Sequence, residues 1–348
     1  MSEEPLISII VLNYNAGKLL LDCIQSIQEI DYSNFEIILV DNVSEDSSQN
    51  ECKKKFPTIK LIQNEKNFGY CEGNNIGMKN AKGEYFLILN PDTIVEKNLL
   101  KELLSAIKQY GEGLYQPKIL SLDNKNILQS TGNMIHLFGF GFAKDKGKID
   151  LEKDEKIKSI GYASGTCLFS TRNIFEKLNY FDSFLFLYHD DLDICWRGKM
   201  KGINSYYVPN SKIYHAESYS LKWSKNKFYW LERNRLYCLK THYSESTINK
   251  IKWELKLIEL LVWIFYISKG YFFAKFNAQL DLKRNNDLII KKHNQIEKEK
   301  IIDDVQLVKQ FPDKIEVPPN VSEGLLSRVF IKLIEIFSKN AKKKIFNN

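Results

Sequence analysis

Short apolar runs alternate with longer amphipathic segments over the first third of the chain. Leu6–Leu12 is an uninterrupted apolar run rich in β-branched residues, and Glu36–Val40 repeats that pattern. Such runs are typical of strands buried on both faces of a parallel sheet. The spacing also predicts helices near residues 19–27, 45–55, 72–81 and 96–110, and strands near residues 59–62 and 85–89. The alternation predicts an α/β fold with a doubly wound, mostly parallel, Rossmann-like sheet.

Polar side chains come directly after the predicted strands. Ligands of such sheets bind beyond the carboxyl ends of the strands. The polar residues at those ends are Asn13, Tyr14, Asp41, Asn90 and Asp92. We therefore expect the functional site at this edge of the sheet. Asp41 could accept hydrogen bonds from a nucleotide, or it could cap the following helix, a task that Ser44 or Asp46 could also perform.

The pattern changes after Ser224. Helical apolar spacing and a charged stretch up to residue 304 predict a helical C-terminal appendage. Pro318-Pro319 predicts a hinge, followed by a last helix with an apolar face formed by Leu326, Val329, Phe330, Leu333 and Phe337. We expect a first domain over residues 1–225, a helical region over residues 226–316, and the hinge with its basic amphipathic helix over residues 317–348.

Basic residues concentrate at the C-terminus. The chain has 50 Lys and Arg against 43 Asp and Glu, and its last 25 residues hold six bases and one acid. A basic helix with an apolar face suits the surface of an anionic membrane. We therefore expect peripheral binding to the inner face of the cell membrane through the C-terminal helices. No nucleic acid partner is expected, because the tail lacks aromatic and basic residues interleaved as stacking platforms.

The apolar stretch over residues 255–274 is too interrupted to span a membrane. It contains Lys256, Glu259 and Lys269, and its longest uncharged run has nine residues, whereas a span needs roughly 20. Two interpretations stay open. The stretch could form a packed core helix, or it could form an interfacial helix assisted by its aromatic residues.

Cysteine usage and composition limit the class of protein. The six cysteines are scattered, without the spacing of a zinc site. The N-terminus lacks the basic flank and small-residue cleavage site of a signal peptide. These features predict reduced thiols in a cytoplasmic protein. With 44% hydrophobic and 27% charged residues, the chain is neither disordered nor collagen-like.

Two polar motifs could bind a metal ion. In Asn90-Pro91-Asp92, an amide and a carboxylate lie two residues apart after a predicted strand. This pair could hold a hard divalent cation together with phosphate oxygens, although the tripeptide is also a good turn. His215 could supply another ligand from a distance, or it could be structural.

An acidic cluster offers candidate catalytic groups. His189-Asp190-Asp191-Leu192-Asp193 places three carboxylates within four residues, and like charges held close together raise one another's pKa. One carboxylate could act as a general base and another could orient a hydroxyl. The alternative is the solvated first turn of a helix, where acidic residues are favourable in any case.

Taken together, these motifs resemble those of inverting glycosyltransferases of family 2 with the GT-A fold, in the rhamnosyltransferase-like branch. The resemblance covers about residues 6–224. It rests on the order and spacing of Ile9–Asn15, Val40–Asn42, Asn67–Gly77, Ala81–Tyr85, Leu89–Thr93 and Phe181–Arg197.

The resemblance implies a role for each strand-end residue. Tyr14 and Asp41 would hold the nucleotide base, and Asn75 would line the donor pocket. Asp92 would bind a divalent ion, Mn²⁺ or Mg²⁺, that bridges the diphosphate of the donor, and His215 would complete the metal shell.

The resemblance also assigns the catalytic groups. Asp191 matches the catalytic base of the family. Asp190 stands where Glu is usual, so its reach is one methylene shorter and the positioning of the acceptor changes. Asn90 occupies the first acidic position of the Asp-x-Asp motif in the donor site, which weakens the charge there.

The implied activity is inverting transfer of a sugar from a nucleotide-diphosphate donor to a hydroxyl group. The donor would be a UDP- or dTDP-sugar, with rhamnose as a candidate, and the acceptor a lipid-linked or polymeric glycan of the cell surface. The alternative is a catalytically idle, nucleotide-sugar-binding scaffold subunit. Within Trp230–Arg235, Arg233 and Arg235 could approach a phosphate or pair with acids.

Overall fold

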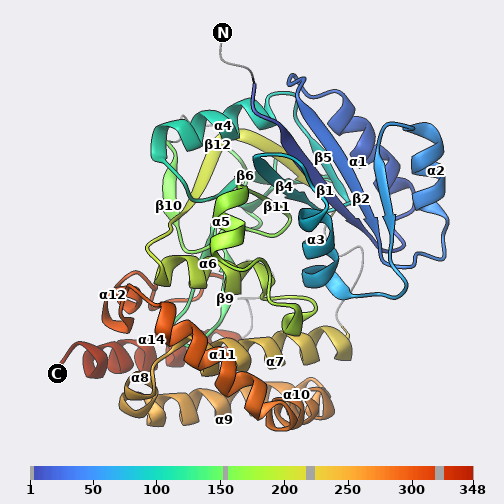
Figure 1. Cartoon of the computed structure of the whole chain (residues 1–348). Helices are drawn as coiled ribbons and strands as arrows, with labels where there is room; N and C mark the ends of the chain where they lie inside the picture. Colours follow the sequence, from blue (N-terminus) through green and yellow to red (C-terminus); the bar gives the residue numbers. More distant parts are fainter. Residues whose placement is uncertain (1–3, 152–155, 217–223, 318–324, 348) are drawn as a thin grey trace. The chain divides into compact units, whose positions relative to one another are not determined.

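The computed structural model describes residues 4–151, 156–216, 224–317 and 325–347 (Figure 1). The chain forms two compact units. The first comprises Met1–Asn133, Lys144–Cys195 and Ile203–Ser220, and the second comprises Met134–Ala143, Trp196–Gly202 and Leu221–Asn348. The domain limits expected at residues 225 and 316 stay predictions, and the hinge expected at Pro318-Pro319 lies outside the described residues.

The first unit is built around one mixed sheet. Its strands are β1 (Ile7–Asn13), β2 (Phe35–Asp41), β3 (Lys60–Gln63), β4 (Tyr85–Leu89), β5 (Thr93–Val95), β6 (Leu114–Ser121), β7 (Leu128–Ser130), β10 (Lys158–Ile160), β11 (Cys167–Thr171) and β12 (Ser205–His215). The order is β10-β12-β6-β11-β4-β1-β2-β3, with β5 on β12 and β7 on β6. β4, β1, β2 and β3 run parallel, as predicted. β11 lies antiparallel between β4 and β6.

Helices cover both faces of this sheet, which confirms the doubly wound arrangement. They are α1 (Lys18–Gln28), α2 (Ser48–Lys55), α3 (Gly69–Lys79), α4 (Leu99–Tyr110), α5 (Arg172–Lys177), the 3₁₀ helix η1 (Ser183–Leu185) and α6 (Asp190–Met200). Ile9 and Val11 of β1 share a buried cluster with α1 and α4. Ile10 points to the opposite face, where a Cβ atom on Gly77 of α3 would lie 2.5 Å from its Cγ2. The glycine therefore permits α3 to pack close to the sheet.

The second unit is mainly helical. It contains α7 (Lys225–His242), α8 (Glu245–Lys250), α9 (Lys252–Ser268), α10 (Phe272–Arg284), α11 (Asn286–Glu299), α12 (Asp304–Lys309) and α14 (Leu325–Phe346), coloured yellow to red in Figure 1. The short strands β8 (Asn133–Ile135) and β9 (Gly141–Ala143) pair with each other. No helix within the described ranges is long and apolar enough to cross a membrane. All six cysteines are buried, and none forms a disulfide in this structure.

A group of four charges, three of them buried and Glu259 partly exposed, ties three helices of the second unit together and is called the buried charge group. Arg235 of α7 pairs with Glu232 at 2.8 Å and with Glu259 of α9. Lys275 of α10 is fully buried and pairs with Glu259 at 2.9 Å and with Glu232. Two cations thus balance two anions, and removing one member would leave an uncompensated buried charge, a loss of about 3–5 kcal/mol.

One helix prediction for the second unit needs correction. The stretch over residues 255–274, expected to form one helix, is divided between α9 and α10, because Gly270 adopts a left-handed φ of 73°. The apolar face expected on the last helix was assigned to a membrane surface, and that contact stays a prediction; the side chain of Leu326 lies outside the described part of the chain. α14 buries Ile334, Ala341 and Ile345, whereas Val329 is exposed. Packing against the unit, rather than the amphipathic pattern alone, selects the buried face.

Candidate functional site

Two of the predicted strand-end residues meet at one edge of the sheet. Asn13 ends β1 and is in register with Asp41, the last residue of the parallel strand β2. Tyr14 follows at the mouth of this edge and exposes 46% of its surface. Its ring is therefore accessible to a planar ligand. Asn90 and Asp92 lie directly beyond β4, the parallel strand on the other side of β1.

The Asp41 carboxylate is buried in a network of hydrogen bonds. It accepts from the Asn13 amide at 2.8 Å, from the Ser44 hydroxyl at 2.6 Å and from the Ser44 backbone N–H at 2.9 Å. Asp41 therefore shapes the loop after β2, and its contact with a base stays a prediction. The network also includes Ser48, whose hydroxyl accepts from Asn13 at 2.9 Å. The sequence analysis placed Asn13 at this edge without a specific role and gave Ser44 only a possible role as a helix cap.

Asn75 of α3 clamps a distant segment of the chain. Its Nδ2 donates to the Phe181 carbonyl at 2.9 Å, and its Oδ1 accepts from the Phe181 N–H at 3.1 Å. Because the amide is matched at both ends, Asn75 anchors the segment that leads to the acidic cluster. Its predicted place in the donor pocket is not tested by these contacts.

Asp92 and His215 come together although they are far apart in the sequence. β5, which follows Asp92, pairs with the end of β12, and His215 Nε2 lies 3.4 Å from Asp92 Oδ2. Asp92 Oδ1 is buried without a hydrogen-bond partner. An orphaned buried carboxylate oxygen is costly, so this arrangement favours a bound cation.

Gln129, which the sequence analysis missed, orients His215. Its Nε2 donates to the His215 carbonyl at 2.8 Å, so its Oε1 is the atom 2.7 Å from His215 Nδ1. Nδ1 then donates to this oxygen, and Nε2 is the ring nitrogen that faces Asp92. Fixing the tautomer of a metal-binding histidine in this way is a common role of an outer residue. No local motif marks Gln129, because it lies on β7, far from His215 in sequence.

Asp190 and Asp191 begin α6, where the strained preceding backbone places them. Phe186, Tyr188 and His189 all have left-handed φ values near 60°. Such residues each cost of order 1–3 kcal/mol and cluster at functional sites. This strain and the burial of Asp190 argue against a merely solvated helix terminus.

The two carboxylates have different environments. Burial, and then the charge of Asp191, raise the pKa of Asp190 well above its usual range. Burial also raises the pKa of Asp191, but the N–H groups of Gly165 and Leu192 donate to it at 3.0 and 2.8 Å and favour its charged form. Asp190 therefore holds a proton more readily than Asp191 does. Asp191, which is half-buried, is the carboxylate available to accept a proton.

A turn at Gly165 connects this acid pair to the Asp92 loop. Gly165 N–H donates to Asp191, and the carbonyl of the following residue, Thr166, accepts from Asn90 N–H at 3.0 Å. Tyr70 Oη donates to the Gly165 carbonyl at 2.6 Å. A Cβ atom on Gly165 would lie 2.8 Å from that hydroxyl and 3.2 Å from Asp190 Oδ2. The site therefore needs glycine here, a requirement that only the tertiary contacts reveal.

Replacing Asp190 should stabilise the protein in a pH-dependent manner. The folded-state pKa of Asp190 lies above the unfolded value of about 3.9. Between these two pKa values the folded state binds more protons than the unfolded state, so the free energy of unfolding falls as pH rises through that range. The Asp190→Asn variant has no carboxylate to ionise at this position, so its free energy of unfolding does not fall in this way. Its melting temperature should exceed that of the wild type by more at about pH 8 than at about pH 4. The exposed Asp123→Asn control should show no such difference, and equal behaviour of both variants would refute the assignment.

Arg233 and Arg235 pair with acids. Arg233 Nη1 lies 3.4 Å from Asp281 Oδ2, and its guanidinium covers the Trp230 ring at 4.4 Å. Arg235 belongs to the buried charge group. The acid-pairing alternative is therefore the one found in the structure.

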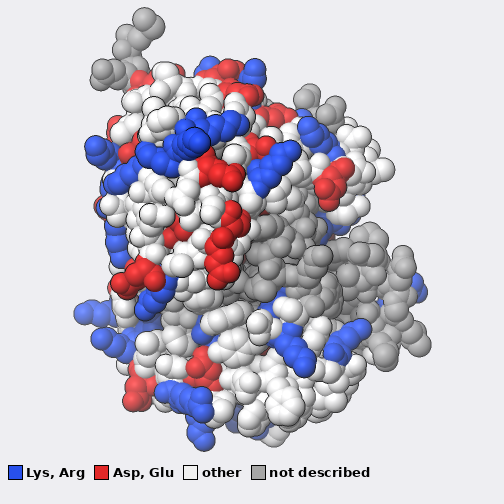
Figure 2. Space-filling view, turned by 90° about the vertical axis from the view of Figure 1, so that its right-hand side faces the viewer, with Lys and Arg blue, Asp and Glu red and all other residues white. Residues whose placement is uncertain are grey.

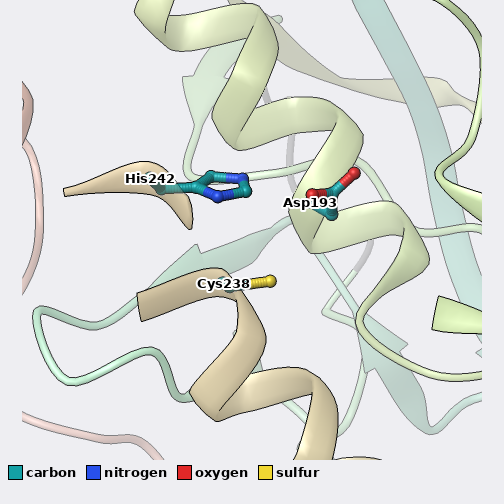
Figure 3. A group of neighbouring side chains, drawn as sticks. All are labelled: Asp193, Cys238 and His242. Atoms are coloured by element: carbon teal, nitrogen blue, oxygen red, sulfur yellow. The ribbon is translucent and has the colours of Figure 1, made fainter. Parts of the chain in front are cut away.

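The sequence analysis gave no individual role to three buried residues of α6 and α7. Figure 3 shows Asp193 on α6, and Cys238 and His242 on α7. His242 Nδ1 lies 2.7 Å from the Thr241 hydroxyl, and the His242 ring meets Trp196 edge-on at 5.0 Å. His242 thus belongs to the core of the second unit.

The comparisons with known proteins agree with this geometry. The sequence profile "Glycosyl transferase family 2" matches residues 8–178. The chain carries a family 2 glycosyl transferase domain. The match covers the strands that position Tyr14, Asp41 and Asp92, and it confirms the family inferred from the motifs.

Two curated relatives extend the similarity beyond this family 2 domain. The "Low-salt glycan biosynthesis hexosyltransferase Agl10" of Haloferax volcanii is 25% identical over 57% of this chain and 63% of its own length. The "N-acetylglucosaminyl-diphospho-decaprenol L-rhamnosyltransferase" of Mycobacterium tuberculosis is 24% identical over 61% of this chain and 76% of its own length. The chain thus spans less than two thirds of the Haloferax protein.

A solved structure confirms the fold. GalNAc-T7, crystallised with UDP, GalNAc and Mn²⁺, superposes with a TM-score of 0.59 at 16% identity, over 74% of this chain and 52% of its own. The likeness shows the fold alone, and it confirms the predicted GT-A type of sheet.

Proposed function

We propose that the protein transfers a sugar from a nucleoside-diphosphate donor to a hydroxyl of a glycan acceptor, with inversion at the anomeric carbon. The observation that carries this proposal is the arrangement around Gly165. One turn holds Asp191 through the N–H group of Gly165 and the loop of Asn90 and Asp92 through the carbonyl of Thr166. A general base and a candidate diphosphate-binding group are thus fastened to the same short segment.

The proposed reaction is a single displacement. Asp191 accepts the proton of the acceptor hydroxyl while the oxygen attacks the anomeric carbon. The bond between that carbon and the diphosphate oxygen breaks, and the nucleoside diphosphate leaves from the opposite face. Asp190, protonated, donates a hydrogen bond that positions the acceptor. No covalent intermediate with the protein forms.

Asp92 and His215 would hold a divalent ion, which when bound neutralises charge on the leaving diphosphate. The carboxylate oxygen and imidazole nitrogen favour Mn²⁺ over Mg²⁺, because Mg²⁺ prefers oxygen ligands. The buried, unpartnered Asp92 Oδ1 supports this fit. Asn90 is half-buried two residues away and would contact the donor through its neutral amide.

The names of the relatives support the finer assignment. One is a hexosyltransferase of glycan biosynthesis and another a rhamnosyltransferase acting on a lipid diphosphate, while GalNAc-T7 was solved with UDP. We propose a UDP- or dTDP-sugar as donor, with rhamnose as a candidate. The acceptor would be a lipid-linked or polymeric glycan, reached at the cytoplasmic face of the cell membrane by a peripherally bound protein.

A nucleotide series tests donor binding. UDP, dTDP, GDP and CDP should be compared by thermal shift, with and without Mn²⁺. One nucleotide, at about 100 times its dissociation constant, should add about 2.7 kcal/mol to the free energy of unfolding, and only with the metal. The matching nucleoside without phosphates is the control ligand. Absence of a shift with all four would contradict the proposal.

A further inference from the structure

α9 exposes a continuous apolar stripe. Its members follow one another at intervals of four and three residues, so they share one side of the helix, and each exposes between 43% and 60% of its surface: Trp253, Leu257, Leu260, Ile264 and Ile267. The opposite side of α9 is buried in the second unit through Ile258, Val262 and Tyr266. α9 therefore carries apolar residues on both its buried and its exposed side.

The stripe continues onto α10. Phe272, Phe273 and Phe276 are all exposed, Phe273 by 70%. The Trp263 ring on α9 lies 5.4 Å from Phe272, which stacks on Phe276 at 6.1 Å. We call the five α9 side chains and these three phenylalanines the α9–α10 ridge. Apolar patches of this extent mark interaction surfaces on soluble proteins.

The exposed charge around the α9–α10 ridge is positive. Between Lys252 and Phe276 the acids are Glu254 and Glu259. Glu254 is buried and pairs with Lys344 at 2.7 Å, and Glu259 belongs to the buried charge group. The exposed charged residues of this segment are Lys252, Lys256 and Lys269. Figure 2 shows both basic and acidic side chains, separated by uncharged surface, on the lower part of the molecule.

A basic groove adjoins one end of the ridge. It has a volume of about 450 Å³ and is lined by Lys250, Lys252, Trp253, Lys343 and Lys344, together with two asparagines. Lys252 and Trp253 belong both to the groove and to the start of α9. Ammonium groups beside a tryptophan suit the phosphates and the interfacial zone of a lipid layer.

We propose that the α9–α10 ridge lies flat in the headgroup region of an anionic lipid bilayer. The apolar side chains enter the boundary with the acyl chains, and the flanking lysines contact lipid phosphates. A second copy of this chain fits the surface less well, because symmetric pairing would bring the lysines of both copies together. α14 contributes Lys343 and Lys344 to the groove, whereas the continuous apolar stripe lies on α9. The proposed contact is therefore centred on α9 rather than on the C-terminal helix favoured by the sequence.

Vesicle flotation tests this surface without donor or acceptor, so its outcome is independent of the proposed transferase activity. The full chain should float with phosphatidylcholine vesicles that contain about 30 mol% phosphatidylglycerol, less well at high salt, and poorly with pure phosphatidylcholine. Ile264→Asp should weaken binding by a factor of about ten or more, because an apolar contact is replaced by a charge.

A matched control separates the ridge from general surface effects. Ile301 is 72% exposed and lies outside the ridge, so Ile301→Asp should float like the wild type. Thermal melting of both variants verifies that they are folded. Equal flotation of Ile264→Asp and wild type would overturn the proposal. It would also be overturned by light scattering that finds a wild-type dimer which Ile264→Asp dissociates, because a second copy would then cover the ridge.

Discussion

Asp191→Asn should reduce sugar transfer by about 10²–10⁴-fold, the usual contribution of a positioned general base. The amide is nearly the same size as the carboxylate, and its oxygen can still accept from Gly165 N–H, which donates to Asp191 at 3.0 Å. The loop should therefore keep its conformation while the proton acceptor is lost. The nucleotide-induced thermal shift should stay close to that of the wild type.

The measurement is the release of nucleoside diphosphate in the presence of the selected donor and a glycan acceptor fraction. Asp123→Asn, an exposed acid of the same unit, is the matched control and should keep wild-type activity. An Asp191→Asn rate within twofold of wild type would disprove the assignment of the base. A wild type that binds the nucleotide yet transfers nothing would instead support the scaffold alternative.

Asp92→Asn should abolish the Mn²⁺-dependent part of nucleotide binding. The carboxylate is the only acid that the structure places within 4.0 Å of His215 Nε2 among the described residues. Its removal takes away the charge that would hold the cation. A nucleotide that adds about 2.7 kcal/mol to wild-type stability should then add little, with or without the metal.

Gln129→Leu provides a graded comparison for this second prediction. It leaves Asp92 and His215 in place but removes the acceptor 2.7 Å from His215 Nδ1. Metal affinity should fall by about 10–100-fold, as is usual for the partner of a ligating histidine. A full Mn²⁺-dependent shift in Asp92→Asn would rule out this metal site, whatever Gln129→Leu does.

The order of the early elements followed from the sequence because their signals are local. Leu6–Leu12 and Glu36–Val40 were predicted as strands, and the structure has Ile7–Asn13 and Phe35–Asp41. Where the pattern is set by tertiary packing, local signals were less reliable. A single glycine at position 270 divides a stretch that looks like one helix, and the buried side of α14 depends on what it packs against.

For the candidate site too, some features could be predicted from the sequence and others required the structure. Asp92, Asp191 and His215 belong to motifs with recognisable residue types and spacing, so their chemistry could be proposed before the structure. The structure added the 3.4 Å approach of His215 to Asp92 and the separate environments of Asp190 and Asp191. Neither follows from residue order, since each depends on atoms contributed by other strands.

The sequence by itself determined the class of fold, the family and the residue types that carry the chemistry, because these reside in periodicity and short motifs. Only the tertiary structure decided the roles of Gln129 and Gly165 and the exposed side of α9. Gln129 acts on a histidine 86 positions away, and Gly165 on acids 25 and 26 positions further along. Such contacts arise from strand order and packing, which local sequence patterns do not specify. For the same reason, the sequence does not indicate which apolar surface stays exposed after folding.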